Sequence, residues 1–358
     1  MNNGIFNTSF IKGISVTVPS HRIDMRDFHF DGVDNEEVIK FTGVHQARRA
    51  VEGETQLDYC LDAAKRLMNE MDFDKSKIDG VVFATPWGDY PTPGNAYLTQ
   101  NLLDLPVECF LVDINQACAG FVNGFFQASM LIQTGYCKNV LVCAGDTATG
   151  INDKDKSLQM LLGDAGAAAI VSKKEGASDT AFAFYNDGRV FKALYVPSGG
   201  KRRDSKKHLE DFKEETVDKD GNTRRLVDSH MDGLEVMAFA MDAVPDAINR
   251  VLKTMDWKKQ DVDLYALHQA NEIMLKTLIK RCRIPAEKVP LTLKNFGNTA
   301  GASIPLDLVL CAKNREKEGN WDKVVMCGFG NGLACAAAAL SLKDTYFSEV
   351  HDFDGVVG

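Results

Sequence analysis

The sequence LVDINQACAGFVNGFFQASMLIQTG, residues 111–135, indicates both the fold and the chemistry of the chain. It begins as an apolar strand, turns at Ala-Cys-Ala-Gly, and continues as a helical pattern with no charged side chain after Asp113. Cys118 therefore stands where a helix begins, and the unpaired N–H groups and the helix dipole there favour thiolate over thiol. We expect Cys118 to be a nucleophile; the alternative is a buried cysteine that serves only as a small apolar side chain.

The composition of the 358-residue chain is that of an ordinary globular protein, long enough for two packed halves. Its formal net charge of −9 argues against nucleic acid or an anionic membrane as a partner. The nine cysteines are scattered without a CxxC pair, which favours reduced thiols over disulfides or a metal site. We see neither a signal-peptide pattern nor an apolar run of the ~20 residues that cross a bilayer, and expect a cytoplasmic protein.

Strand and helix patterns alternate along residues 1–175, and the theme repeats along residues 176–358. We therefore predict an α/β fold made of two similar halves. Helices that begin after Ala117 and after Gly301 occupy matching places, which hints at an internal duplication. Further predicted elements are a strand over 191–197, a helix over 302–317, and closing strands over 321–330 and 333–342.

Residues 198–229 depart from this pattern because they are almost wholly polar and dense in charges of both signs. Such a segment cannot supply apolar core, so we expect a surface excursion. A solvated loop is the simpler interpretation, and a lid or a partner-docking insert is the alternative.

Three further motifs lie in the second half of the chain. YALHQAN places His268 at the end of an apolar strand, where side chains face the ligand crevice of an open α/β sheet. NFGNTAGAS places Asn298 in a tight turn that could aim its amide inward. In MCGFGNGLACAAAAL, Gly330, Asn331 and Gly332 form a loop that could bring backbone N–H groups to a substrate carbonyl. Taken singly, each motif has a purely structural alternative: His268 could be a core histidine, Asn298 could be a turn asparagine, and the 330–332 loop could be an ordinary turn.

Taken together and in this order, the motifs resemble those of the β-ketoacyl-acyl-carrier-protein synthase III family of thiolase-fold condensing enzymes. The resemblance spans nearly the whole chain and is carried by FTGVHQARRA, ACAGF, LLGDAGAAA, SGGKR, MDGLEVMAFA, HQAN, GNTAGAS and FGNG. It implies a five-layered αβαβα fold, usually in a homodimer. It also implies that Cys118 accepts an acyl group and forms a triad with His268 and Asn298.

The resemblance further implies a substrate class and a partner. Acyl-CoA or an acyl-carrier-protein thioester donates the acyl group, and acyl carrier protein is the partner. The Cys118 sulfur attacks the thioester while N–H groups of Cys118 and of the 330–332 loop hold the oxyanion. A malonyl thioester then loses carbon dioxide, and His268 with Asn298 stabilises the enolate that attacks the acyl-cysteine. The reaction serves fatty-acid initiation or a specialised lipid, glycan or secondary-metabolite pathway, and needs no metal or redox cofactor.

Several positions depart from the family pattern where substrate is held. Relatives that start fatty acids sandwich the adenine of coenzyme A between a tryptophan and an arginine. Here NEEVIKFTGV lacks the tryptophan, and Lys156 stands for the arginine, whose stacking a lysine cannot reproduce. Ile273 occupies the position at which some relatives have an arginine that docks carrier protein. Asn331 occupies a position at which many relatives have glycine, and only its backbone N–H would be needed there. Trp87 and Tyr90, in a loop after an apolar strand, are predicted to line the acyl pocket.

Three other functions stay open at this point. An acyltransferase of the same fold would pass the acyl group to an oxygen or nitrogen acceptor without condensation. A thiolase would need a second cysteine in the C-terminal glycine-rich loop, and Cys327 lies about one residue out of that spacing. A catalytically silent partner subunit would be expected to lose triad members, whereas this chain keeps all three.

Overall fold

The computed structural model of the protein describes residues 4–148, 151–218, 220–313 and 321–355, and most of its strands join two sheets. The first sheet consists of β2 (Ser9–Val18), β5 (Gly80–Ala84), β6 (Phe110–Ile114), β7 (Asn139–Asp146), β8 (Ala165–Lys173) and β17 (Tyr346–Asp352). Their order is β17-β2-β8-β7-β5-β6. Strand β5 is parallel to both neighbours, whereas β8 is antiparallel to β7 and β2.

The second sheet consists of β1 (Ile5–Phe6), β9 (Thr180–Asn186), β14 (Leu264–Leu267), β15 (Val324–Gly330) and β16 (Ala334–Leu340). Their order is β1-β9-β16-β15-β14, and only the β14–β15 pair is parallel. Strands β14, β15 and β16 are buried along their whole length, which is why they read as continuous apolar runs and do not alternate. Three short antiparallel pairs lie outside the two sheets: β3 (Arg22–Asp24) with β4 (Gln46–Arg48), β10 (Leu194–Tyr195) with β13 (His230–Met231), and β11 (Thr216–Val217) with β12 (Thr223–Arg224).

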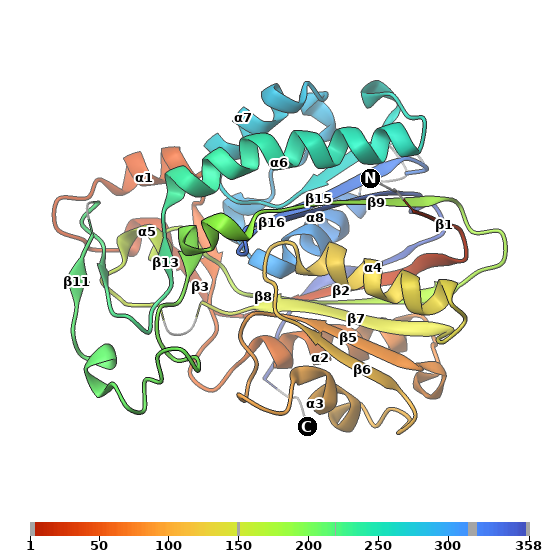
Figure 1. Ribbon diagram of the computed structural model, residues 1–358, viewed down its shortest axis with the longest axis horizontal. Helices are drawn as coiled ribbons and strands as arrows, with labels where there is room; N and C mark the ends of the chain where they lie inside the picture. The colour runs from red at the N-terminus through yellow and green to blue at the C-terminus, as the bar shows by residue number, and fades with distance from the viewer. Residues whose placement is uncertain (1–3, 149–150, 219, 314–320, 356–358) are drawn as a thin grey trace.

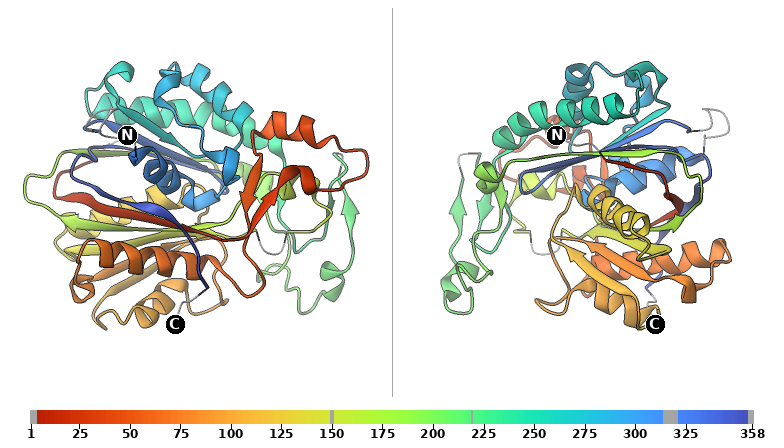
Figure 2. Two further views of the ribbon diagram at one scale, coloured as in Figure 1. Left: turned by 180° about the vertical axis from the view of Figure 1, so that it is seen from behind. Right: turned by 45° about the vertical axis from the view of Figure 1, so that its right-hand side comes forward.

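Helices separate and cover the two sheets, so the molecule has five layers (Figures 1 and 2). Helices α4 (Gly120–Gln133) and α8 (Ser303–Ala312) lie between the sheets and share one apolar core with both of them. Helices α2 (Gln56–Glu70) and α3 (Asn95–Leu102) cover the outer face of the first sheet, and α6 (Gly233–Thr254) and α7 (Glu272–Cys282) cover that of the second. The smaller helices are α1 (Asn35–Thr42) and α5 (Lys156–Gln159). The predicted five-layered thiolase-like fold is confirmed.

The central helices follow from their sequences. Helix α4 carries no charged residue and is mostly apolar, and α8 carries a single charged residue, Asp307. A helix that is apolar all round is stable only when other elements cover it on all sides. Both helices start at the same edge of the sheets, after Ala119 and Ala302, as the matching positions in the sequence predict.

Strand membership departs from a simple division of the chain at residue 175. Strand β17, near the C-terminus, pairs in parallel with β2 of the first sheet, and β1, near the N-terminus, pairs with β9 of the second. Each chain end thus adds an edge strand to the sheet built mainly by the other half. The sequence analysis missed β17 because YFSEVHD is mostly polar, with only Ser348 buried.

One local prediction needs correction. The segment predicted as a strand over 191–197 forms a 3-10 helix, Gly188–Ala193, and only the two-residue strand β10. Its aromatic and β-branched residues suggested a strand, but β10 pairs with the equally short β13, which leaves the rest of the segment outside a sheet. The helix predicted over 302–317 is α8; residues 314–317 lie outside the described residues.

The segment 198–229 is a surface excursion, but it is more ordered inside than a solvated loop. It holds a short 3-10 helix, Leu209–Phe212, and the β11–β12 hairpin. Arg224 is buried and ion-paired with the buried Asp155 at the start of α5, and it also contacts Asp218 at 2.8 Å. The described residues of this segment supply no apolar core, as expected, and its interior is held by paired charges.

Candidate active site

The predicted nucleophile lies in the turn that leads from β6 into α4. The Gly120 N–H donates to the Ala117 carbonyl at 2.7 Å, which closes a tight turn around Cys118. The Ala117 N–H donates to the side-chain Oδ1 of Asn331 at 3.2 Å. Asn331 was expected to matter only through its backbone; its side chain in fact ties the glycine-rich loop to the nucleophile turn. Sequence patterns carry no signal for such a long-range contact.

Two glycines of β15 allow its backbone to lie directly on Cys118. A β-carbon at Gly328 would stand 2.4 Å from the Cys118 carbonyl oxygen, and one at Gly330 would stand 2.9 Å from the Cys118 Sγ. A side chain in either place would force a neighbouring atom to move, so glycine is the residue that fits without a shift. Gly332 follows with φ of 132°, a conformation that glycine adopts without strain. The loop predicted to serve an oxyanion therefore adjoins the sulfur.

His268 follows β14 and is held from three sides. Its backbone N–H donates to the Cys327 carbonyl at 2.9 Å, its ring meets Phe329 edge-on at 5.2 Å, and its Nδ1 lies 2.8 Å from the Ser303 Oγ. The side chain is buried, and burial lowers the pKa of His268 to about 3. The imidazole is therefore neutral at physiological pH. The sequence analysis missed Ser303, although it is the last residue of the quoted GNTAGAS motif.

Asn298 lies in the turn before α8. Its Nδ2 donates to the Ala270 carbonyl at 3.3 Å, and its Oδ1 accepts from the Ala300 N–H at 2.9 Å. Its backbone forms an isolated bridge with Leu162, and the Gly163 N–H donates to its carbonyl at 2.9 Å. The amide is thus fixed in orientation by the HQAN segment on one side and by its own turn on the other.

These contacts bring the separate motifs to one end of the two sheets. Gly330 touches Cys118, and a β-carbon at Gly301 would stand 3.1 Å from the Ala117 carbonyl oxygen. His268 forms hydrogen bonds with Cys327 of β15 and with Ser303, the first residue of α8. The three predicted triad residues therefore come from elements that pack on one another. Their individual roles remain predictions.

The expected thiolate at Cys118 is not supported. Burial raises the pKa of Cys118 far above that of an ordinary thiol, and the nearby Asp146 carboxyl raises it further. A backbone N–H at the turn acts in the opposite direction but is outweighed. Since the resting side chain is a thiol, its proton must leave as the sulfur attacks. The helix-start argument correctly placed the residue but neglected the desolvation of a charged sulfur between two sheets.

The remaining substrate-site predictions fall on residues at the surface or its edge. Trp87 and Tyr90 are about half exposed, at 47% and 58%, so neither is enclosed in a pocket of the single chain. Lys156 begins α5, and a β-carbon at Gly221 of the 198–229 segment would stand 3.2 Å from its Nζ. Whether any of the three contacts substrate stays a prediction.

Cys327 is placed on the wrong face for a thiolase acid/base. It is buried with its Sγ 3.6 Å from that of Cys335, among the residues that pack under α6 and α7. Neighbouring strand residues point to opposite faces, so Gly328, next to Cys327, faces Cys118. The thiolase interpretation is therefore not supported by this geometry.

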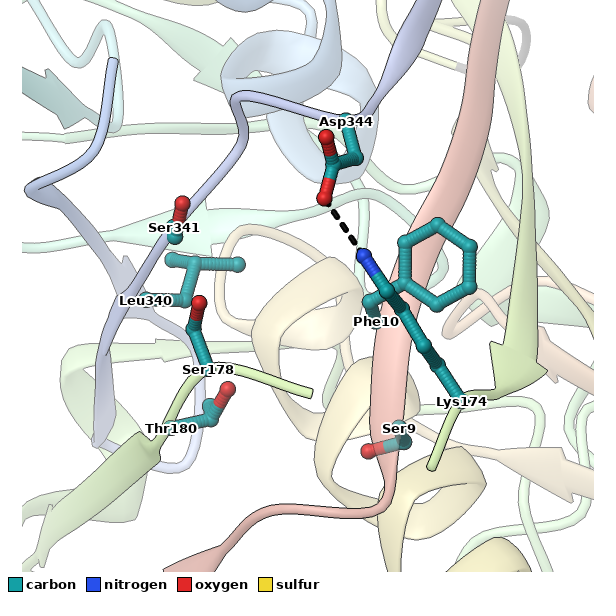
Figure 3. A pocket seen from close by; sticks show the side chains of 8 residues that line it. All are labelled: Ser9, Phe10, Lys174, Ser178, Thr180, Leu340, Ser341 and Asp344. Atoms are coloured by element: carbon teal, nitrogen blue, oxygen red, sulfur yellow. Dashed lines mark hydrogen bonds and ion pairs between the residues drawn. The ribbon is translucent and has the colours of Figure 1, made fainter. Parts of the chain in front are cut away.

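A small hollow of about 20 Å³ lies at the opposite end of both sheets (Figure 3). It is lined by Ser9, Thr180 and Leu340, among others, and the Lys174–Asp344 ion pair stands beside it. Strand register places Ser9 opposite Lys173, at the far end of β8 from Ala165. The hollow is thus separate from the Cys118 site.

Among the described residues, no cluster of three or more His, Cys, Asp or Glu side chains could hold a metal ion, and no helix is long and apolar enough to span a membrane.

Comparison with known proteins identifies the family. Residues 112–188 match 3-oxoacyl-[acyl-carrier-protein (ACP)] synthase III, and residues 252–342 match its C-terminal region. The chain is 31% identical to the β-ketoacyl-[acyl-carrier-protein] synthase III of Rhodopirellula baltica, over 92% of this chain and 96% of the relative.

Two solved structures have the same fold over almost their whole length. A 3-oxoacyl-(acyl-carrier protein) synthase from Burkholderia xenovorans LB400 is 32% identical with a TM-score of 0.89, covering 98% and 99% of the two chains. The priming β-ketosynthase of the R1128 polyketide biosynthetic pathway is 25% identical with a TM-score of 0.79, covering 94% and 96%. The chain belongs to the β-ketoacyl-[acyl-carrier-protein] synthase III family.

Proposed function

We propose that the protein catalyses a decarboxylative Claisen condensation between an acyl thioester and malonyl-acyl-carrier protein. The observation that carries the proposal is the packing of the Gly330 backbone against the Cys118 sulfur, with neutral His268 and the oriented Asn298 amide on adjoining elements. An acyl-cysteine formed there would have backbone N–H groups close to its carbonyl oxygen. Membership of the family supports the same reaction.

The first half-reaction transfers the acyl group to Cys118. The sulfur attacks the thioester carbonyl, the carbon–sulfur bond of the donor breaks, and the departing thiol takes up one proton. Because the resting Cys118 is protonated, a neutral base must receive its proton during the attack. His268 would pass this proton on to the departing thiolate of the donor and would not retain it, because a neutral imidazole has one nitrogen free to accept a proton while burial disfavours the imidazolium form.

The second half-reaction requires the opposite tautomer. After carbon dioxide leaves the malonyl thioester, a hydrogen bond from Nε2–H of His268 and another from the Asn298 amide would stabilise the enolate oxygen. The enolate carbon then attacks the acyl-cysteine, the carbon–sulfur bond to Cys118 breaks, and the released Cys118 takes up one proton from solvent. The Ser303 hydroxyl beside Nδ1 can donate or accept, so it fits both tautomers of His268.

The central test is the intact mass of the protein after incubation with a panel of acyl-CoA and acyl-carrier-protein thioesters. We expect an acyl adduct at Cys118, absent from C118A, and the accepted donor identifies the natural carrier. Labelled malonyl-carrier protein should then release carbon dioxide and remove the adduct. Removal of the adduct by an alcohol or amine without release of carbon dioxide would instead support the oxygen or nitrogen acyltransferase. An adduct of equal size on C118A would overturn the assignment.

We also propose that the protein is a homodimer formed through β6, the edge strand of the first sheet. Exposed apolar side chains lie around this edge, among them Val107 at 86% and Tyr136 at 70% exposure. An unpaired edge strand with an apolar surround is a ready site for pairing with a second copy. Light scattering after size exclusion should give twice the chain mass, and V107D should lower the measured mass.

The free state of all nine cysteines supports a reducing, cytoplasmic location.

A further inference from the structure

A buried carboxylic acid lies directly behind the nucleophile turn and has no part in the proposed reaction. Asp146 is the last residue of β7 and is 7% exposed. Its Oδ2 accepts from the Gly301 N–H at 2.8 Å, and its Oδ1 accepts from the Thr85 hydroxyl at 3.2 Å. Gly301 also approaches the Ala117 carbonyl, so one carboxyl group joins the end of β5, the turn before α8 and the turn that holds Cys118.

The titratable groups that interact with Asp146 are acids and thiols. The groups that interact electrostatically with Asp146 are Cys118, Cys60 on α2, and Asp164 before β8. Arg49, a cation beside Asp164, is ion-paired with that carboxylate at 3.8 Å. Among the described residues, none forms an ion pair with Asp146. A negative charge at Asp146 is therefore stabilised only by two hydrogen bonds, and it opposes any further negative charge nearby.

Burial accordingly raises the pKa of Asp146 to about 8, with Asp164 adding to the effect. The same carboxyl raises the pKa of the Cys118 thiol. The two groups oppose each other's ionisation, as two acids in one poorly solvated site must.

We propose that Asp146 is a positioning residue whose charge controls how readily Cys118 becomes a thiolate. In its neutral form Asp146 holds the Gly301 turn and leaves the sulfur free to ionise during acylation. In its ionised form it keeps Cys118 as a thiol. The idea rests on Cys118 as the nucleophile of the proposed function, but it concerns a property of the thiol that can be measured without any substrate.

The test is the pH dependence of Cys118 alkylation by iodoacetamide, followed by mass spectrometry of the Cys118 peptide from pH 6 to 10. For the natural protein, the logarithm of the rate should rise with pH and then rise less steeply above about pH 8, where Asp146 ionises. Asp146→Asn keeps the shape but cannot ionise, so its rate should rise without the bend. The two rates should agree near pH 6.5 and differ about tenfold at pH 9.5, the effect of one pKa unit on Cys118.

Thr85 supplies a second, milder test. Thr85→Val removes a hydrogen bond that stabilises the ionised carboxylate, so the bend should move to higher pH. Thr85→Ser keeps the hydroxyl and should leave the bend where it is. Parallel curves for all four proteins would overturn the proposal, as would a bend that survives in Asp146→Asn. Since no acyl donor is used, either result leaves the condensation itself to be judged by the acyl-adduct experiment.

Discussion

Replacing Gly330 by alanine tests whether the close contact between β15 and the nucleophile is needed for chemistry. The added β-carbon would stand 2.9 Å from both the Cβ and the Sγ of Cys118. Two carbon atoms in ordinary contact are ~3.5–4.0 Å apart, so the sulfur or the strand must move by roughly 0.6–1.1 Å. The turn around Cys118 and the strand β15 are both held by backbone hydrogen bonds, so the Cys118 side chain is easier to displace than either backbone.

A displacement of this size is large for catalysis and moderate for folding. Misplacing a reacting atom by about 1 Å costs on the order of 10²-fold in rate. Overpacking a well-filled site by one methyl group costs about 1–3 kcal/mol of unfolding free energy, which a chain with three apolar cores can absorb. We therefore expect Gly330→Ala to fold and to lose about 99% of its rate of acylation at Cys118.

The assay measures single-turnover acylation by intact mass, together with chemical unfolding. Gly233→Ala, at the exposed start of α6, is the matched control, because its added β-carbon meets no atom within 4 Å. The control should match the natural protein in both measurements. Acylation of Gly330→Ala within about twofold of the natural rate would refute the argument, since the crowding at Cys118 would then have no consequence for the sulfur.

Three further predictions follow from the site and the insert. Burial depresses the folded-state pKa of His268 to about 3, so its contribution to stability is full above pH 6.5 and is lost as pH falls toward 3. Between pH 6.5 and 4 this amounts to about 3 kcal/mol, and His268→Gln should remove that part of the acid dependence in unfolding experiments. Ser303→Ala should slow decarboxylation by about tenfold, because the imidazole of His268 loses the hydrogen bond that orients it. Ser303→Thr keeps the hydroxyl and should retain most of the rate. Equal decarboxylation rates for the natural protein and both variants would count against a role for this hydrogen bond. Arg224→Met leaves the buried Asp155 unpaired at a cost of about 3–5 kcal/mol, so limited proteolysis should cut within residues 198–229 before it cuts the layered body.

The sequence predicted the fold and the position of the site well, because both depend on local patterns. Apolar runs interrupted by turns indicated the strands, and the motifs marked the ends of elements that meet. It predicted less well what depends on distant contacts. The thiolate expected at Cys118, the backbone-only role of Asn331 and the omission of Ser303 all concern neighbours more than twenty-five residues away in the chain. The same holds for Asp146, which in sequence is only the acid at the end of a buried strand.

The glycine-rich motifs are explained by backbone contacts more than by chemistry of their own. At Gly163 a β-carbon would stand 1.8 Å from the Phe296 carbonyl oxygen, so the LLGDAG and NFGNT segments can lie together only with glycine there. Gly328 and Gly330 do the same for the nucleophile. Such contacts fix where Cys118 and Asn298 stand, and they do not depend on which thioester enters. The positions that depart from the family pattern include Ile273, which is 41% exposed, and Lys156, whose Nζ lies near Gly221 of the insert. We therefore expect reaction type and donor choice to be carried by different parts of this chain, so that the second can change while the first is kept.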